Sequence, residues 1–245
     1  MMEAIVLAGG FGTRLGELTR ETPKPMLRIG DRPFLYYVLR YLAAQQISRV
    51  VLSVGHLSEQ IHTYFGDHAC GMPLEYCPEE MPLGTAGALR LAMEHCNGAE
   101  FLAVNGDTLV LVDLAAMLHQ HHERQALVTL AACPVKDASR YGAVIYDSKA
   151  RVTGFAEKGQ MGSGDINAGM YLFQKQALTG IPPGRPASLE QEVLPKLAAD
   201  GRLYAYASAA YFIDIGVVED YRRAQREIPL RFTSPPESTE LTHDR

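Results

Sequence analysis

The sequence lacks the features that mark disulfide-rich, zinc-binding and membrane proteins. Its four cysteines form no CxxC pair and have no histidine at zinc-ligand spacing, so we expect buried or incidental thiols. No apolar run is long enough to cross a bilayer. Glu3 precedes the short apolar segment at the start, which fits neither a signal peptide nor a transmembrane span. These absences favour a cytoplasmic protein without membrane contact.

Blocks of like charge are also missing. The net charge of -5 comes from residues of both signs scattered along the chain, which argues against a nucleic-acid-binding surface. The hydrophobic fraction, 47%, is ample for a buried core. We therefore expect a chain that folds alone, with any functional positive charge confined to one place.

Strand and helix patterns alternate in the first half of the chain. The expected strands are 3–8, 49–54 and 101–104, and the expected helices are 34–45, a short helix from Ser58, 84–96 and 114–122. Ser58 and Asp113 are suited to cap the helices that follow them. This alternation predicts a mostly parallel sheet covered on both faces, in an α/β fold.

The second half has a different rhythm. The expected strands are 127–135, 142–146, 151–157, 166–173, 203–207 and 211–213, with a turn at Asp147-Ser148. Ser188 followed by Gln191 predicts a capping box for a helix that ends near Ala199, and a last helix surrounds Tyr221. We expect one domain over residues 1–228, with halves at about 1–125 and 126–228, and a flexible tail over 229–245.

A glycine-rich loop directly follows the first strand. LAGGFGTRL, from Leu7 to Leu15, contains Gly9, Gly10 and Gly12, whose backbone amides can approach a phosphate without Cβ interference. The spacing matches neither a P-loop nor GxGxxG, and on the glycines alone a structural turn is an equal alternative. Arg14 and Lys24, the latter fixed between two prolines, add cations that suit a triphosphate.

LAGGFGTRL followed by TPKPML resembles the signature of sugar-1-phosphate nucleotidyltransferases, and the similarity of pattern extends from Glu3 to about Gln225. This resemblance implies a Rossmann-like three-layer α/β/α domain with a mostly parallel mixed sheet, the nucleotide-diphospho-sugar transferase fold. It implies a catalytic role for Arg14, Lys24 and Asp107. The loop residues that it implies in nucleotide binding are Leu7, Ala8, Gly9, Gly10, Gly12 and Thr13.

Acidic residues follow strands at two distant places. VNGD places Asp107 after a buried strand, where α/β sheets present ligands to a cleft, and FIDIG contains Asp214. Magnesium is often bound by only one or two carboxylates, with phosphates and water completing its octahedron. Locally these acids could also be turn or strand-end residues. The resemblance implies that both bind Mg²⁺.

Further segments match the sugar side of the family. The resemblance implies that Lys158, beside Glu157 in FAEKG, holds the phosphate of the sugar, and that Asn167, Gly169 and Gly142 face the sugar. Its implied substrate-binding residues are Gly106, Gly142, Glu157, Lys158, Asn167, Gly169 and Asp214. Asn and Gly are also ordinary strand-end residues, so the structural alternative stays open for them.

The segment EEMPLGTAGAL resembles the part of the family that binds the nucleotide base. Glu79 or Glu80 can accept from the two donors on the pairing edge of guanine, which favours GTP as co-substrate, with Gly84 and Thr85 opening a helix. If both glutamates are solvated, backbone groups select the base, and uridylyl, thymidylyl or cytidylyl transfer stays open.

PLGTAGALRLA, NGDT, SRYGAV and FIDIG together most resemble D-glycero-D-manno-heptose 1-phosphate guanylyltransferases of surface glycan biosynthesis. Mannose 1-phosphate is the alternative substrate, and a homo-dimer or homo-tetramer is compatible with the resemblance. A non-enzymatic alternative is a sugar-nucleotide sensor or assembly subunit that kept the fold and lost the chemistry.

Overall fold

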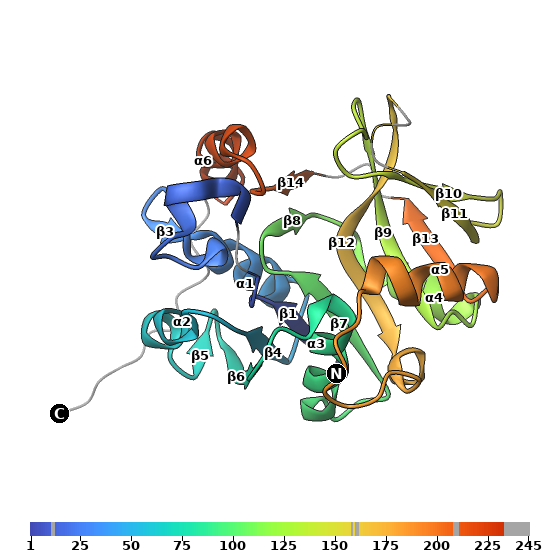
Figure 1. Ribbon diagram of the computed structural model, residues 1–245, viewed down its shortest axis with the longest axis horizontal. Coiled ribbons are helices and arrows are strands. Elements are labelled where there is room, and N and C mark those ends of the chain that lie inside the picture. Colours follow the sequence, from blue (N-terminus) through green and yellow to red (C-terminus); the bar gives the residue numbers. More distant parts are fainter. Residues whose placement is uncertain (11–12, 158, 160–161, 208–210, 233–245) are drawn as a thin grey trace.

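The centre of the molecule is a mixed β-sheet (Figure 1). A computed structural model describes all residues except 11–12, 158, 160–161, 208–210 and 233–245. Within the described residues, eight strands follow the order β13-β9-β12-β7-β1-β4-β6-β5. These strands are β1 (Glu3–Leu7), β4 (Arg49–Val54), β5 (His68–Ala69), β6 (Met72–Pro78), β7 (Glu100–Asn105), β9 (Val128–Val135), β12 (Gly164–Gln174) and β13 (Leu203–Ala207).

Strand direction gives the sheet one functional edge. β1 pairs in parallel with β4 and β7, and β4 pairs in parallel with β6, so the carboxyl ends of these strands share an edge. β12 is antiparallel to both β7 and β9, whereas β13 is parallel to β9. Buried apolar runs such as β1 and β4 are typical of parallel strands covered on both faces. The predicted mixed sheet is confirmed.

Helices cover both faces of the sheet. They are α1 (Phe34–Ala44), α2 (Ser58–Phe65), α3 (Gly84–Ala92), α4 (Leu114–Glu123), α5 (Leu194–Ala199) and α6 (Val218–Arg231), with short 3-10 segments η1 (Thr13–Thr19), η2 (Lys24–Met26), η3 (Met93–His95) and η4 (Lys175–Leu178) and a π-helical turn η5 (Leu189–Val193). Along β1, Ala4 and Val6 belong to the core cluster of α1, α2, α4 and α6, whereas Ile5 belongs to that of α3 and α5. This alternation confirms the predicted three layers.

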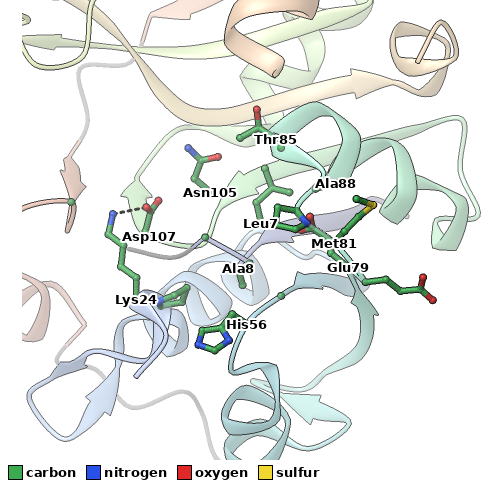
Figure 2. A pocket seen from close by; sticks show the side chains of 18 residues that line it. Leu7, Ala8, Lys24, His56, Glu79, Met81, Thr85, Ala88, Asn105 and Asp107 are labelled. Atoms are coloured by element: carbon green, nitrogen blue, oxygen red, sulfur yellow. Dashed lines mark hydrogen bonds and ion pairs between the residues drawn. The ribbon is translucent and has the colours of Figure 1, made fainter. Parts of the chain in front are cut away.

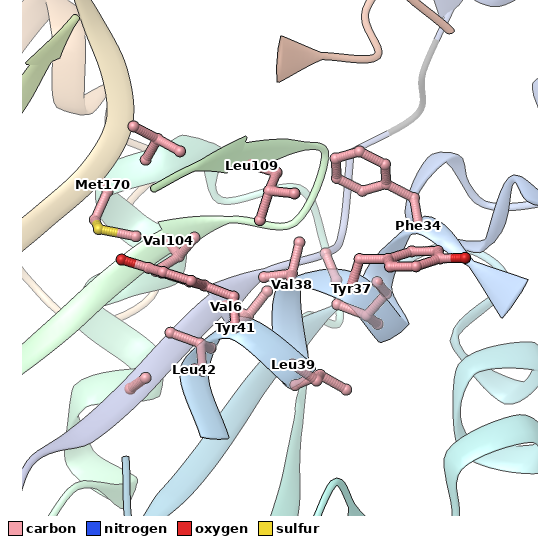
Figure 3. Close-up of a cluster of buried hydrophobic side chains, with 14 of the residues drawn as sticks. Val6, Phe34, Tyr37, Val38, Leu39, Tyr41, Leu42, Val104, Leu109 and Met170 are labelled. Carbon is pink, nitrogen blue, oxygen red and sulfur yellow. The ribbon is translucent and has the colours of Figure 1, made fainter. Parts of the chain in front are cut away.

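Helix α1 fills the larger core cluster (Figure 3). The apolar stripe of this predicted helix is fully buried and consists of Leu35, Val38, Leu39 and Leu42. The hydroxyl of Tyr37 donates to the carbonyl of Ile29 at 2.9 Å. The hydroxyl of Tyr41 donates to the carbonyl of Val112 at 3.0 Å and accepts from the Val112 amide at 3.1 Å. The buried phenols therefore keep their hydrogen bonds while their rings pack in the core.

Some helix starts differ from the sequence prediction. The chain enters α2 through Leu57, whose φ is 63°, and Ser58 makes no capping bond, so the predicted Ser58 cap is wrong. At η5 the hydroxyl of Ser188 accepts from the Gln191 amide at 3.2 Å, as predicted. The amide of Ser188, however, donates to the carboxylate of Glu192 at 3.0 Å instead of to Gln191. Only half of the predicted capping box therefore forms.

Other element boundaries were predicted with mixed success. Asp113 accepts from the Ala116 amide at 3.0 Å, which confirms it as the cap of α4. The sequence patterns miss β6, in which exposed and half-buried residues interrupt the apolar positions. Helix α6 continues past Pro229 to Arg231, beyond the expected start of the tail, and residues 233–245 lie outside the described part of the chain.

Three small ribbons lie beside the main sheet in the described structure. They are β2 (Arg28–Ile29) with β3 (Arg32–Pro33), β10 (Ala143–Tyr146) with β11 (Val152–Ala156), and β8 (Thr108–Val110) with β14 (Phe212–Asp214). In the last ribbon Asp214 lies opposite Thr108, and the Ile215 amide donates to the carbonyl of Asp107 at 3.1 Å. Antiparallel pairing thus brings together acids that are far apart in the sequence.

Glu3 holds the opposite end of β1. The residue is 6% exposed, and its carboxylate accepts from Arg49 Nε at 2.9 Å and from the amides of Asn97 and Gly98 at 2.6 and 3.3 Å. Burial alone would raise the pKa of Glu3, but these hydrogen bonds and the charge of Arg49 outweigh it and lower the pKa. Ionised Glu3 therefore joins β1 to β4 and to the segment that precedes β7.

We predict that Glu3→Gln lowers the free energy of unfolding by about 1–3 kcal/mol at pH 7, because hydrogen bonds to a buried charge are lost or weakened. The folded pKa is depressed, so the stabilisation is full above the unfolded value near 4.5 and disappears as the pH falls through the folded pKa. Urea unfolding of the unmodified protein and of Glu3→Gln, from acid pH to pH 7, measures this difference in the free energy of unfolding. A deficit that persists unchanged at acid pH would contradict the role of ionised Glu3.

Candidate active site

A cavity of about 760 Å³ lies at the carboxyl ends of β1, β4, β6 and β7 (Figure 2). We call it the first cavity. Its lining includes the sequence-predicted residues Leu7, Ala8, Gly9, Gly10, Lys24, Glu79, Glu80, Gly84, Thr85 and Asp107. Clefts at the carboxyl edge of an α/β sheet are the usual ligand sites of such folds. The structure thus brings together residues that the sequence placed in separate motifs.

The start of the glycine loop is fixed by the sheet. The Ala8 amide donates to the carbonyl of Ser53 at 2.8 Å, which extends the pairing of β1 with β4. A Cβ on Gly9 would lie 3.1 Å from the amide nitrogen of Gly55, so the two backbones pass in close contact. At Gly10 a Cβ would meet no atom of the described residues within 4 Å. Gly9 is therefore tightly packed against the neighbouring backbone, whereas Gly10 lines the cavity.

Part of the predicted phosphate loop lies outside the described residues. This holds for Gly12 and for the side chains of Thr13 and Arg14, whose backbone begins η1. Their roles stay predictions. Lys24, in contrast, is well described: it begins η2 directly after Pro23, and the Leu27 amide donates to its carbonyl at 3.1 Å.

Lys24 joins the two predicted metal-binding acids. Its Nζ lies 2.5 Å from Oδ2 of Asp107 and 3.4 Å from Oδ1 of Asp214, and its side chain is only 12% exposed. Asp107 follows β7 and Asp214 ends β14, and the β8–β14 ribbon sets the distance between them. The predicted convergence of these acids and a cation at one edge of the sheet is therefore observed.

The environment of Asp214 opposes its ionisation. Burial is the largest effect and raises its pKa, and the nearby charge of Asp107 raises it further. Lys24 and the backbone amide of Gly216 act in the opposite direction without restoring the ordinary pKa. Burial of the Asp214 carboxylate and its proximity to Asp107 therefore outweigh the stabilising effect of Lys24.

A second cavity, of about 840 Å³, lies beyond Asp214. Its lining contains the predicted sugar-side residues Gly142, Glu157, Asn167, Gly169 and Asp214. Asn105 lines both cavities, so they meet at the end of β7. Lys158, predicted for this side, lies outside the described residues.

Two predicted substrate-side glycines have close protein neighbours. A Cβ on Gly169, where φ is 72°, would lie 2.7 Å from Nδ2 of Asn105. A Cβ on Gly106 would lie 2.8 Å from the carbonyl of Leu7, to which the Gly106 amide donates at 2.8 Å. Gly106 is not part of either cavity lining. Packing between neighbouring strand ends therefore accounts for both glycines without a ligand.

The loop between β6 and α3 is held by Glu79. The hydroxyl of Ser53 donates to Oε1 of Glu79 at 3.3 Å, and the Leu83 amide donates to Oε2 at 3.0 Å. Gly84 then begins α3 with a φ of 67°, and a Cβ there would lie 2.6 Å from the carbonyl of Ala187. Only glycine combines this backbone conformation with so close a contact. Glu79 is thus an ordered acid at the wall of the first cavity.

Several cavity residues were not predicted from the sequence. The first cavity also contains Pro25, Gly55, His56, Met81, Pro82, Ala88, Asn105 and Gly216, and the second also contains Arg140, Tyr141, Phe155, Ala156, Tyr171, Ser188, Glu190, Gln191 and Pro195. Gly55 and His56 directly follow β4, so the rule that ligands bind at carboxyl ends could have found them. No local motif marks Glu190 as a cavity residue, because its position depends on how η5 packs against α3.

Comparison with known proteins agrees with this geometry. A model of the family described as nucleotidyl transferase matches residues 3–230. The chain belongs to this family. No helix among the residues that the structure describes is long and apolar enough to cross a membrane.

This nucleotidyl transferase has well-matched relatives. It is 43% identical over 227 residues to D-glycero-alpha-D-manno-heptose 1-phosphate guanylyltransferase of Aneurinibacillus thermoaerophilus, covering 93% of this chain and 98% of that one. It is 38% identical to mannose-1-phosphate guanylyltransferase of Mycobacterium tuberculosis, covering 99% of this chain and 70% of that one. HddC from Yersinia pseudotuberculosis complexed with GMP-PN is similar in structure, with a TM-score of 0.83, 33% identity and coverage of 93% and 100%.

We predict that Asp214→Asn keeps or raises the free energy of unfolding of the transferase, by up to about 1 kcal/mol at pH 7. Because the folded pKa is raised, ionised Asp214 costs stability above its unfolded value near 3.8, and this cost vanishes as the pH falls below that value. Asparagine can still accept from Gly216. Urea unfolding with a chelator present, at neutral and acid pH, measures the difference. A large loss of stability at pH 7 would contradict this account.

Proposed function

We propose that this transferase moves a nucleoside monophosphate from a nucleoside triphosphate to a sugar 1-phosphate, with release of pyrophosphate. The observation that carries the proposal is the contact of Lys24 with both Asp107 and Asp214, where the two cavities meet. A cation and paired acids between two cavities suit a reaction that joins two phosphorylated substrates. The family membership of residues 3–230 supports the same reaction class.

The triphosphate would lie in the first cavity. Gly9 and Gly10 line this cavity beside Lys24 and offer backbone close to phosphate oxygens. For the base we propose guanine. Glu79 lines the cavity and is already fixed by donors on each of its oxygens, and a carboxylate oxygen can accept more than one hydrogen bond. The N1-H and amino group of guanine are matching donors. The names of the relatives, both guanylyltransferases, support this choice.

The sugar 1-phosphate would lie in the second cavity, and we propose D-glycero-D-manno-heptose 1-phosphate. The relative that is 43% identical and matched over 98% of its length carries this substrate in its name. Mannose 1-phosphate is the competing substrate, because the mycobacterial relative is named for it. Asn167, Glu157 and Glu190 supply polar side chains for sugar hydroxyls. The product would be a nucleotide sugar for surface glycan synthesis, made in the cytoplasm.

We also propose that Asp107 and Asp214 hold a divalent cation, Mg²⁺, when Lys24 turns from these carboxylates toward the phosphates. The donor set fits, because Mg²⁺ prefers oxygen ligands and often takes only one or two carboxylates beside phosphates and water. The described residues contain no group of three or more His, Cys, Asp or Glu that could hold a metal alone, so the substrates would complete its shell. Both carboxylates contact the same ammonium group, so they are close enough to share one cation, and their mutual repulsion favours positive charge beside them. When bound, the ion would supply that charge beside the phosphates.

In the proposed reaction an oxygen of the sugar phosphate attacks the α-phosphorus of the triphosphate. The new bond is oxygen to α-phosphorus, and the bond that breaks joins α-phosphorus to the oxygen bridging to the β-phosphate, which leaves with pyrophosphate. Lys24 would neutralise charge on the phosphates, and the protein needs no nucleophile of its own. Holding two substrates in line contributes about 7–11 kcal/mol in favourable models.

We predict that Asp107→Asn lowers kcat at least about 100-fold, because an electrostatic contact at the reacting phosphates is lost. The free energy of unfolding should change by less than about 1 kcal/mol, since Asp107 packs little in the core. Pyrophosphate release is measured over a matrix of nucleoside triphosphates and sugar 1-phosphates, with and without Mg²⁺. Asp200→Asn, at the exposed end of α5, is the matched control and should be fully active.

The same matrix tests the proposed function itself. Turnover by the unmodified protein with GTP and heptose 1-phosphate or mannose 1-phosphate is the expected result. If no pair of substrates is turned over but calorimetry detects binding of a nucleotide sugar without metal, the chain is a sensor and the proposed function is wrong.

Base selection gives a further prediction. Glu79→Gln should lower the kcat/KM preference for GTP over UTP about 10-fold, since one acceptor on the guanine edge is replaced by a donor. Glu80→Gln, a neighbouring change of the same kind at an exposed residue, should change this preference less than about 3-fold. Equal effects of the two substitutions would refute the assignment of Glu79.

A further inference from the structure

The π-helical turn η5 presents a carboxylate to the second cavity. Glu190 is exposed and lines this cavity together with Asn167 and Tyr171. Its Oε2 accepts from the hydroxyl of Thr85 at 2.9 Å and from the hydroxyl of Ser188 at 3.2 Å. Both donors approach the same oxygen. Among the residues that the structure describes, no donor contacts Oε1, so that oxygen keeps its capacity to accept from a ligand.

The position of Glu190 is fixed by contacts outside the turn. The Thr85 hydroxyl accepts from the Leu189 amide at 2.8 Å while it donates to Glu190, so α3 and η5 are interlocked. Pro195 follows the turn and has no amide hydrogen for the carbonyl of Gln191, which favours the wider π-helical turn over an α-helical one. Irregular turns of this kind are frequent at functional sites.

The wall around Glu190 suits a polyhydroxylated ligand. The Asn167 amide donates to the hydroxyl of Tyr171 at 2.8 Å, and its carbonyl oxygen accepts from the Gly169 amide at 3.2 Å, so these groups are ordered. A carboxylate with one oxygen held and the other available accepts hydrogen bonds from hydroxyls and repels a phosphate. Glu190 therefore matches the hydroxyl-bearing part of a sugar phosphate rather than its anionic end.

We infer that Glu190 is a specificity-determining residue that accepts a hydrogen bond from a hydroxyl of the sugar substrate. The inference rests on the proposed function, because it names a contact in the sugar-side cavity of that reaction. Thr85 and Ser188 are positioning residues that hold Oε2, and Oε1 is directed to the ligand. Hydrogen bonds of Thr85 thereby join α3, on the proposed nucleotide side, to Glu190 on the proposed sugar side.

The first test compares Glu190→Gln with the unmodified protein. KM for the sugar 1-phosphate, measured with whichever of heptose 1-phosphate and mannose 1-phosphate is turned over, should rise about 10-fold or more, since a hydrogen bond to a charged acceptor is lost. KM for GTP should change less than about 3-fold. Glu123→Gln is the control: Glu123 is exposed at the end of α4 and lines neither cavity, so both KM values should stay unchanged.

Comparing KM for the sugar 1-phosphate with KM for GTP distinguishes a direct contact of Glu190 with the sugar from a purely structural role of Glu190. If Glu190 served only to hold Thr85, its substitution would raise KM for GTP at least as much as KM for the sugar, and the inference would be wrong. It would also be wrong if Glu190→Gln and Glu123→Gln had equal effects on KM for the sugar 1-phosphate.

A substrate series identifies the hydroxyl. Monodeoxy analogues of the accepted sugar 1-phosphate are assayed with both proteins. The penalty of Glu190→Gln should disappear for the one analogue that lacks the contacting hydroxyl and persist for the others. A penalty that is the same for every analogue overturns the inference, while the proposed function stands. Absence of turnover by the unmodified protein would instead refute the proposed function.

Discussion

The architecture of the site depends on Lys24 lying between Asp107 and Asp214. Two carboxylates so close together repel each other, and burial of Asp214 adds to that cost, so a positive charge must accompany them. The ammonium supplies it in the structure described. Everything that sets this distance therefore matters to the site: the end of β7, the β8–β14 ribbon and the prolines that flank Lys24.

The directions of the strands place the residues that line both cavities at one edge of the sheet. The carboxyl ends of the parallel strands β1, β4, β6 and β7 line the first cavity. The antiparallel strand β12 contributes Asn167 and Gly169 to the second cavity. Close backbone contacts, such as Gly9 against Gly55, make the loops at this edge parts of the packed structure. At the far edge, Glu3 and Arg49 hold the same strands together. The first residue of β1 therefore contributes to stability, and its last residue lines the first cavity.

Much of the fold could be predicted because its signals are local. The apolar run of β1, the stripe of α1 and the Asp113 cap each depend on a few neighbouring residues. The phosphate loop, Lys24 and the two aspartates were predicted as separate motifs, and the structure brings the described ones together. Glu190 could not be predicted, because its role depends on Thr85, which is distant in sequence. The predicted Ser58 cap of α2 was wrong because the chain enters that helix through Leu57 in a left-handed conformation, without a side-chain cap.

The contact between Gly84 and Ala187 has a consequence for how such proteins can diversify. The backbone at the start of α3 and the backbone at Ala187 fit together with no room for a single carbon atom, and the Ala86 amide donates to the carbonyl of Ala187 at 3.0 Å. Recombination that exchanges one half of the chain for that of a relative must preserve this close fit. A chimera cut between the two segments keeps the fit only where the incoming half supplies a glycine, or a backbone of the same course, at the contact.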